Sequence, residues 1–286
     1  MTAVTAGIDR ARAGALVPAT RIGTVTAVAV LGVFLVAAVA PGVFTPVDPA
    51  RTDLAAVLRP PSATHVLGTD ELGRDLLARL VHGTGPSLAI GVGATIVGLL
   101  LGLVVAGAAL LGPRWLDDLL MRVTDVGLAF PEILLALLVI AVLGPGPVNA
   151  AVAIGVGSAP GFARLLRARA RVVQTSLFVE AATGFGVRPV VATLRHVVPN
   201  AVGPVVVLAT ISAGTNIIIA AGLSFLGFGA APPAAEWGLT LAQGRNVIGA
   251  AWWVALFPGL AITVVVLAVT AVGRALERRL GGEVER

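Results

Sequence analysis

The sequence predicts an all-α integral membrane protein with six transmembrane helices. Of its 286 residues, 57% are hydrophobic and 12% are charged, and the mean hydropathy is +0.97. A soluble domain carries about 25% charged residues, so the missing charge implies that lipid is the solvent for much of this chain. The apolar residues form six segments, most of them close to the ~20 residues that cross about 30 Å of hydrocarbon. These segments are about 22–40, 87–111, 123–143, 148–162, 201–223 and 251–272.

The arginines predict how these segments are oriented. With the N-terminus on the cytoplasmic side, 15 arginines lie inside and 5 lie outside, which is the bias expected of a membrane protein. The five outer residues are Arg51, Arg59, Arg74, Arg79 and Arg245. The expected organisation is a cytoplasmic tail over 1–21, a transmembrane domain over 22–273 and a cytoplasmic tail over 274–286. An external loop is expected over about 44–86 and a cytoplasmic loop over about 164–200.

Composition excludes several classes of function. The chain has no cysteine, so disulfides and thiolate metal sites are impossible. It has no lysine either, and because a Walker A phosphate loop needs one, the chain does not hydrolyse ATP in that way itself. The net charge of +5 follows from the inner arginines, so no nucleic-acid partner is expected. His65, His82 and His196 lack ligand spacing, so neither a metal site nor a catalytic residue is expected.

The segment over 87–111 carries small residues on one side. Ala94, Gly98, Gly102 and Ala106 recur every four residues, which places them on one face of a helix. Such a face lets another helix approach closely, so helix packing is the expected role and pore lining is the alternative.

The external loop has the pattern of a short amphipathic helix over about 70–83. Thr69 is the expected cap and Gly83 the expected end. The leucines that recur once per turn are Leu72, Leu76 and Leu80. We expect this helix to pack on the membrane or on the other spans; docking of an external partner is the alternative.

The cytoplasmic loop has the pattern of two short helices. The first is expected to start after Ser176 and to run toward Gly186, where backbone can come close to backbone. The second is expected to start near Pro189 and to end at Pro199. Its apolar residues predict a single buried face: Val190, Val191, Leu194, Val197 and Val198. A loop of this length and patterning offers a surface to another protein.

Motifs along the chain carry a family resemblance. Glu180-Ala181-Ala182, followed by Gly186 and Pro199, resembles the EAA motif of ABC importer permeases. The other matching stretches are Leu67–Asp75, Met121-Arg122 with Asp125 and Leu128–Pro131, Leu223–Gly229 with Pro232-Pro233 and Trp237-Gly238, and Phe257–Leu260. Together, over about residues 22–275, they resemble the C-type permease subunit of the dipeptide/oligopeptide/nickel family.

This resemblance implies a type I ABC importer permease fold in the bacterial inner membrane, with both termini cytoplasmic. It also implies partners: a homologous B-type permease subunit, two ABC ATPase subunits or domains that bind the ATP and Mg, and an external solute-binding protein. The cargo would be a di- or oligopeptide, nickel or another small solute. The cytoplasmic loop would form a coupling helix in a groove of the ATPase. The residues implied for that contact are Phe178, Glu180, Ala181, Ala182, Gly186, Arg188 and Pro199.

Three polar residues are candidates for the pore or a gate. Asp125 and Glu132 flank the inner end of the third segment, as gate residues or contacts between helices. Asn216 lies in the middle of the fifth segment, as a pore residue or as a hydrogen-bond partner of a neighbouring helix. The alternative function is an ion-coupled secondary transporter, which usually needs ionisable groups near the midplane. A membrane-embedded enzyme would need paired acids or histidine clusters in the spans, and the sequence has none.

Overall fold

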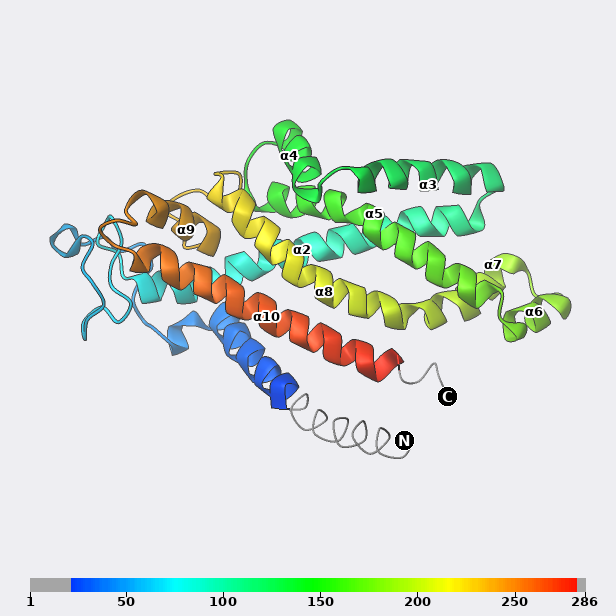
Figure 1. Ribbon diagram of the computed structural model, residues 1–286, viewed down its shortest axis with the longest axis horizontal. Helices are drawn as coiled ribbons and strands as arrows, with labels where there is room; N and C mark the ends of the chain where they lie inside the picture. The colour runs from blue at the N-terminus through cyan, green and yellow to red at the C-terminus, as the bar shows by residue number, and fades with distance from the viewer. Residues whose placement is uncertain (1–21, 282–286) are drawn as a thin grey trace, which may run out of the picture.

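In the computed structural model, which describes residues 22–281, the long helices lie lengthwise in an elongated bundle (Figure 1). No β-strand occurs within that range. The elements are a helix over Ile22–Val39, the turns η1 (Pro41–Val43) and η2 (Leu54–Ala56), α2 (Leu76–Leu111), α3 (Arg114–Ala129), α4 (Glu132–Leu143), α5 (Pro147–Gln174), α6 (Leu177–Gly184), α7 (Pro189–Ala192), the π-helical turn η3 (Thr193–Val197), α8 (Val198–Phe225), α9 (Trp237–Asn246) and α10 (Trp253–Gly281). The loop before α2 and α9 lies at one end, and α6 and α7 lie at the other (Figure 1). The expected tail over 1–21 and the last residues of the expected tail over 274–286 lie outside the described residues.

Part of the predicted set of spans is present as single helices. Four helices are long and apolar enough to cross a membrane: the one over Ile22–Val39, and those that contain Gly203–Phe225, Leu76–Leu111 and Trp253–Arg279. The pair α3 and α4 adds a fifth span if the two count as one. The predicted segment over 148–162 lies in α5, where Asn149, Ser158 and Pro160 dilute the apolar residues. Length and composition therefore give four or five spans in the described part of the chain.

The predicted segment over 123–143 does not form one continuous helix, because it is broken in the middle. The axes of α3 and α4 differ by 100°. Pro131 has no amide hydrogen to continue the helix, and it holds Phe130 in an extended conformation with φ −94° and ψ 141°. The break turns α4 away from α3, as Figure 1 shows, so that Glu132 begins a new helix.

The predicted short helix over 70–83 is also wrong. Residues 70–75 form a turn, and α2 begins only at Leu76, where the Asp75 side chain accepts a hydrogen bond from the Ala78 amide at 2.9 Å. The helix then continues past Gly83 to Leu111. Thr69 and Asp75 are both good capping residues, and they lie six positions apart. The helix begins after the second of them, Asp75. Leu76 is fully buried, so this first part of α2 packs inside the protein.

Glycine conformation explains why the chain turns before Asp75. Gly68 and Gly73 have φ of +81° and +70°, which side chains disfavour. A Cβ on Gly73 would collide with the carbonyl oxygen of Asp53, so the turn is pressed against the preceding loop. Thr69 does not cap a helix; its hydroxyl donates to the carbonyl of Ala56.

The small residues of α2 face α5. All four are buried: Ala94, Gly98, Gly102 and Ala106. A Cβ on Gly98 would collide with the Ser158 hydroxyl, and a Cβ on Gly102 would lie 2.5 Å from Cβ of Phe162. The two helix backbones approach closely along this face, as small residues permit.

Ion pairs join α3 to α5 near the end of the bundle that carries α6 and α7. Asp117 is buried and accepts from Arg167 Nε at 2.5 Å and Nη2 at 2.6 Å. Arg171 Nη2 donates to the same carboxylate at 2.8 Å. Asp125 and Arg164 form an exposed ion pair at 3.0 Å. These contacts hold α3 against α5 on the N-terminal side of the break at Pro131.

Candidate functional site

The helix α6 is held against the rest of the protein by its buried Val179 and by an edge-to-face contact between the rings of Phe178 and His196. Val179 packs against Ala170 of α5, Ala192 of α7 and Val197 of η3. Ser176 occupies the capping position, but its hydroxyl donates to the carbonyl of Val173 and makes no cap hydrogen bond. The segment from α6 to α7 protrudes at one end of the bundle, as Figure 1 shows.

This segment exposes five large apolar side chains, which we call the inner apolar surface: Leu177, Phe178, Phe185, Val190 and Val191. Leu177 is 84% exposed, Phe178 is 50% exposed and Phe185 is 91% exposed. The prediction of a buried face is wrong for Val190 and Val191, which are exposed, and it holds for Val197. The side chains of Leu194 and Val198 are not among those described.

The motif residues lie beside this surface. Glu180, Ala181 and Arg188 are exposed, and Ala182 is half-buried. Gly186 has φ +87°, and a Cβ there would meet nothing within 4 Å. Its amide donates to the carbonyl of Thr183 at 3.0 Å, and the next amide donates to Ala182 at 3.1 Å, which closes the end of α6. The glycine thus ends the helix and leaves open space above its backbone.

The expected helix end at Pro199 is wrong. The chain stays helical from α7 through the π turn η3 into α8, and Pro199 is the second residue of α8. A proline in the first turn of a helix removes no internal hydrogen bond, so the helix accepts it.

A cavity of about 480 Å³ lies where the break between α3 and α4 meets α5 and α8. Its volume falls in the range of about 300–1,000 Å³ that ligand pockets usually have. Two of the three candidate pore residues, Glu132 and Asn216, lie on its wall. The third, Asp125, is exposed and paired with Arg164 outside the lining.

Asn216 and Glu132 differ in how they are held. Asn216 is buried, and its Nδ2 donates to the Thr95 hydroxyl of α2 at 3.0 Å. Glu132 has a buried Oε1 atom with no hydrogen-bond partner in the described part of the chain. A Cβ on Gly157 would lie 3.0 Å from the Glu132 carbonyl and 3.1 Å from its Cγ, so the absence of a side chain there makes room for the glutamate.

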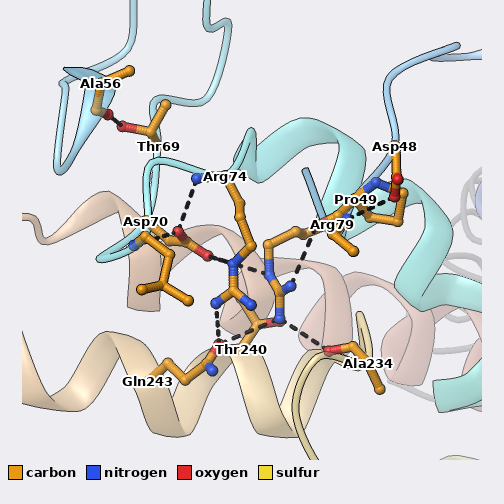
Figure 2. Close-up of polar contacts among 12 residues, drawn as sticks. Asp48, Pro49, Ala56, Thr69, Asp70, Arg74, Arg79, Ala234, Thr240 and Gln243 are labelled. Carbon is orange, nitrogen blue, oxygen red and sulfur yellow. Dashed lines mark hydrogen bonds and ion pairs between the residues drawn. The ribbon is translucent and has the colours of Figure 1, made fainter. Parts of the chain in front are cut away.

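At the opposite end, charged residues form a buried polar network (Figure 2). We call Asp70, Arg74, Arg79 and Gln243 the outer polar network. Arg74 Nε donates to Asp70 Oδ2 at 2.7 Å, and Arg79 Nε lies 3.5 Å from the same oxygen. Both arginines also donate from Nη2 to Gln243 Oε1 at 3.3 Å. Figure 2 shows the two guanidinium groups side by side between the turn and α9.

This network joins segments that are distant in the sequence. Arg79 donates to the carbonyl of Ala234 at 3.0 Å and to that of Pro49 at 3.4 Å. The side chains of Asp70 and Arg79 are fully buried. The sequence pattern, which places Arg79 in the last turn of a short helix, did not predict this network. The signal that could have found it is an acid and an arginine four residues apart, followed by a second arginine, in a chain with few charges.

The family model and the relatives that match this chain are all membrane components of transport systems. The family model described as "Binding-protein-dependent transport system inner membrane component" matches residues 98–282. The Di/tripeptide transport system permease protein DppC of Pseudomonas aeruginosa (strain UCBPP-PA14) is 40% identical over 241 residues, which cover 82% of this chain and 80% of that protein. The Glutathione transport system permease protein GsiD of Escherichia coli O6:K15:H31 (strain 536 / UPEC) is 42% identical over 225 residues, covering 79% and 74%.

A solved structure shares the fold. A chain of the MetNI methionine ABC transporter in an inward-facing conformation aligns with a TM-score of 0.59 over 71% of this chain and 96% of that one. The identity is 22%, so the likeness concerns the fold alone.

Proposed function

The chain belongs to the family of binding-protein-dependent transport system inner membrane components, and from that premise we propose that it carries di- or oligopeptides into the cell. It is a permease subunit of an ABC importer in the bacterial inner membrane. The peptide cargo is supported by relatives named for di/tripeptide, dipeptide and glutathione transport. The cavity at the break between α3 and α4, with Glu132 and Asn216 on its wall, is proposed as part of the translocation pathway.

We further propose six membrane crossings with both termini in the cytoplasm. The bent pair of α3 and α4 supplies one crossing and α5 supplies another, beside the four single helices. This arrangement puts α6 and α7 on the same side as the 15 inner arginines. The outer polar network then lies on the external side, where a solute-binding protein would dock.

The observation that carries the proposal is the inner apolar surface. Large apolar side chains that are exposed beyond the spans mark a site for another protein, because water does not favour them. Leu177, Phe178 and Phe185 stand out from the bundle, and Gly186 leaves open space next to them. We propose that one ABC ATPase binds here and that a second one binds a homologous B-type permease subunit. ATP and Mg would be bound by those ATPases, because this chain has no lysine for a Walker A loop.

Variants of Gly186 test this assignment. Gly186→Trp fills the open space and is expected to abolish both ATPase binding and peptide uptake while the protein still inserts in the membrane. Gly186→Asn is the matched control, because asparagine tolerates positive φ and is small. It is expected to retain most of both activities.

The measurements are ATPase copurification and uptake of a labelled dipeptide in cells that carry the partner subunits. Undiminished copurification and uptake with Gly186→Trp would remove the coupling assignment. Loss of both with Gly186→Asn as well would show that the backbone turn matters and the open space does not.

A further inference from the structure

The cavity between α3, α4, α5 and α8 has an unusual charge. Its lining contains one ionisable side chain among the described residues, Glu132. The other lining residues are uncharged, and those that carry a hydroxyl group are Ser158, Ser212 and Thr215. The chain as a whole carries a net charge of +5, so an acidic cavity without a basic residue is a local exception.

No residue in the described part of the chain forms a hydrogen bond or ion pair with the carboxyl group of Glu132. Its Oε1 is buried and accepts no hydrogen bond from residues 22–281. The α5 arginines that pair with acids do so elsewhere: Arg164 with Asp125, and Arg167 and Arg171 with Asp117. A buried acidic group without a partner is costly, and such groups within membrane segments usually have a function.

The backbone around Glu132 leaves space for its side chain. Pro131 breaks the helix directly before Glu132, and Gly157 on α5 gives it room. Hydroxyl groups line the same cavity, and Ser158 donates its proton to the carbonyl of Gly155, so its lone pairs remain free to accept. A cation with several N–H donors could therefore be bound by the carboxylate and by neutral oxygens together.

We propose that Glu132 binds the ammonium group of a peptide as the peptide passes through the cavity. An ammonium group has three donors and one positive charge, which match a carboxylate with hydroxyl groups nearby. A single ion pair in an open cavity is weak enough to release its ligand, as a pathway requires. This inference rests on the proposed function in peptide import.

The test uses the assembled, nucleotide-free importer in nanodiscs without the external binding protein, so that selection by that protein is absent. The probes are labelled Ala-Ala, N-acetyl-Ala-Ala, and N-acetyl-Ala-Lys, which carries its ammonium group on the side chain. Wild type is expected to bind Ala-Ala about tenfold more tightly than N-acetyl-Ala-Ala. Glu132→Gln is expected to lose that preference, and Glu132→Asp to restore part of it.

Asp125→Asn is the matched control, because it changes an exposed acid outside the cavity lining. It is expected to keep the preference of wild type. Binding of N-acetyl-Ala-Lys at the level of Ala-Ala would support a site for any ammonium group, and binding at the level of N-acetyl-Ala-Ala would support a site for the peptide N-terminus.

Two results would overturn the inference. One is an unchanged preference in Glu132→Gln. The other is loss of the second permease subunit from the Glu132→Gln complex, which would assign the carboxylate to a contact between subunits. Absence of ATP-driven Ala-Ala uptake by the complete wild-type importer would instead count against the proposed function, so the two failures are distinguishable.

Discussion

Replacing Asp70 by asparagine is expected to loosen the outer end of the protein. Asp70 lies between two buried guanidinium groups, with Arg74 Nε at 2.7 Å and Arg79 Nε at 3.5 Å. Its other oxygen accepts from the amides of Leu72 and Arg74 at 2.9 and 3.0 Å. The Asp70→Asn substitution would keep the size of the side chain and remove the charge that compensates both arginines.

The size of the effect follows from that geometry. Breaking a buried ion pair by removing one partner costs about 3–5 kcal/mol, because the other charge stays buried without compensation. The equilibrium constant between the folded and the locally unfolded turn over 70–75 would therefore change by about two to three and a half orders of magnitude. Asp53→Asn is the matched control in the same loop. The exposed carboxylate of Asp53 accepts from the Ala55 amide at 3.0 Å, and asparagine caps equally well, so a change of about 0.5 kcal/mol or less is expected.

Tryptophan fluorescence provides the assay. The indole Nε1 of Trp253 donates to the carbonyl of Thr69 at 3.1 Å, so the emission of Trp253 reports on the turn that holds Asp70. Urea unfolding of the purified protein in detergent should show an early transition in Asp70→Asn that is absent in wild type and in Asp53→Asn. If Asp70→Asn unfolds within about 1 kcal/mol of the control, the outer polar network does not stabilise this end of the protein.

Two further predictions concern packing and orientation. Gly102→Ala places a Cβ 2.5 Å from Cβ of Phe162 and is expected to destabilise the protein by about 1–3 kcal/mol, whereas Gly107→Ala meets nothing within 4 Å and should gain up to about 1 kcal/mol. Thermal melting in detergent compares the two, and equal stabilisation by both would contradict close packing of α2 on α5. Because the chain has no cysteine, Leu54→Cys and Phe185→Cys, at positions 79% and 91% exposed, each provide a single thiol. An impermeant maleimide should label the first in intact spheroplasts and the second only after permeabilisation; the reverse order would contradict the orientation.

Hydropathy predicted most long helices but could not locate the break in one of them. The segment over 123–143 has an apolar character that Pro131 does not change, so a count of apolar residues reads it as continuous. The backbone responds instead to the missing amide hydrogen and to the extended conformation of Phe130. The candidate cavity depends on this break, so its shape could not be predicted from the apolar pattern.

Local capping rules were insufficient at the start of α2. Thr69 and Asp75 are both good caps, and the choice between them depends on tertiary contacts. Gly73 packs against Asp53, and Asp70 binds two arginines that also contact α9. Contacts over such distances leave little trace in a single sequence.

The inner apolar surface shows another limit of prediction from the sequence. The pattern from Val190 to Val198 predicts one buried face, but Val190 and Val191 are exposed in the chain by itself. Apolar periodicity tells which residues avoid water, and it does not tell whether they are covered by the same chain or by a partner. The motif of Glu180, Ala181 and Ala182 was found from the resemblance, and the structure adds that Glu180 and Ala181 are exposed.

We propose that this chain forms a peptide pathway driven by ATP hydrolysis in other subunits. The most direct test is uptake of Ala-Ala by proteoliposomes that contain this chain, its partner permease, the ATPases and the external binding protein. We expect uptake that requires ATP, stops when the ATPases are omitted and does not respond to an imposed proton or sodium gradient. Uptake that persists without the ATPases and follows an ion gradient would instead identify a secondary transporter.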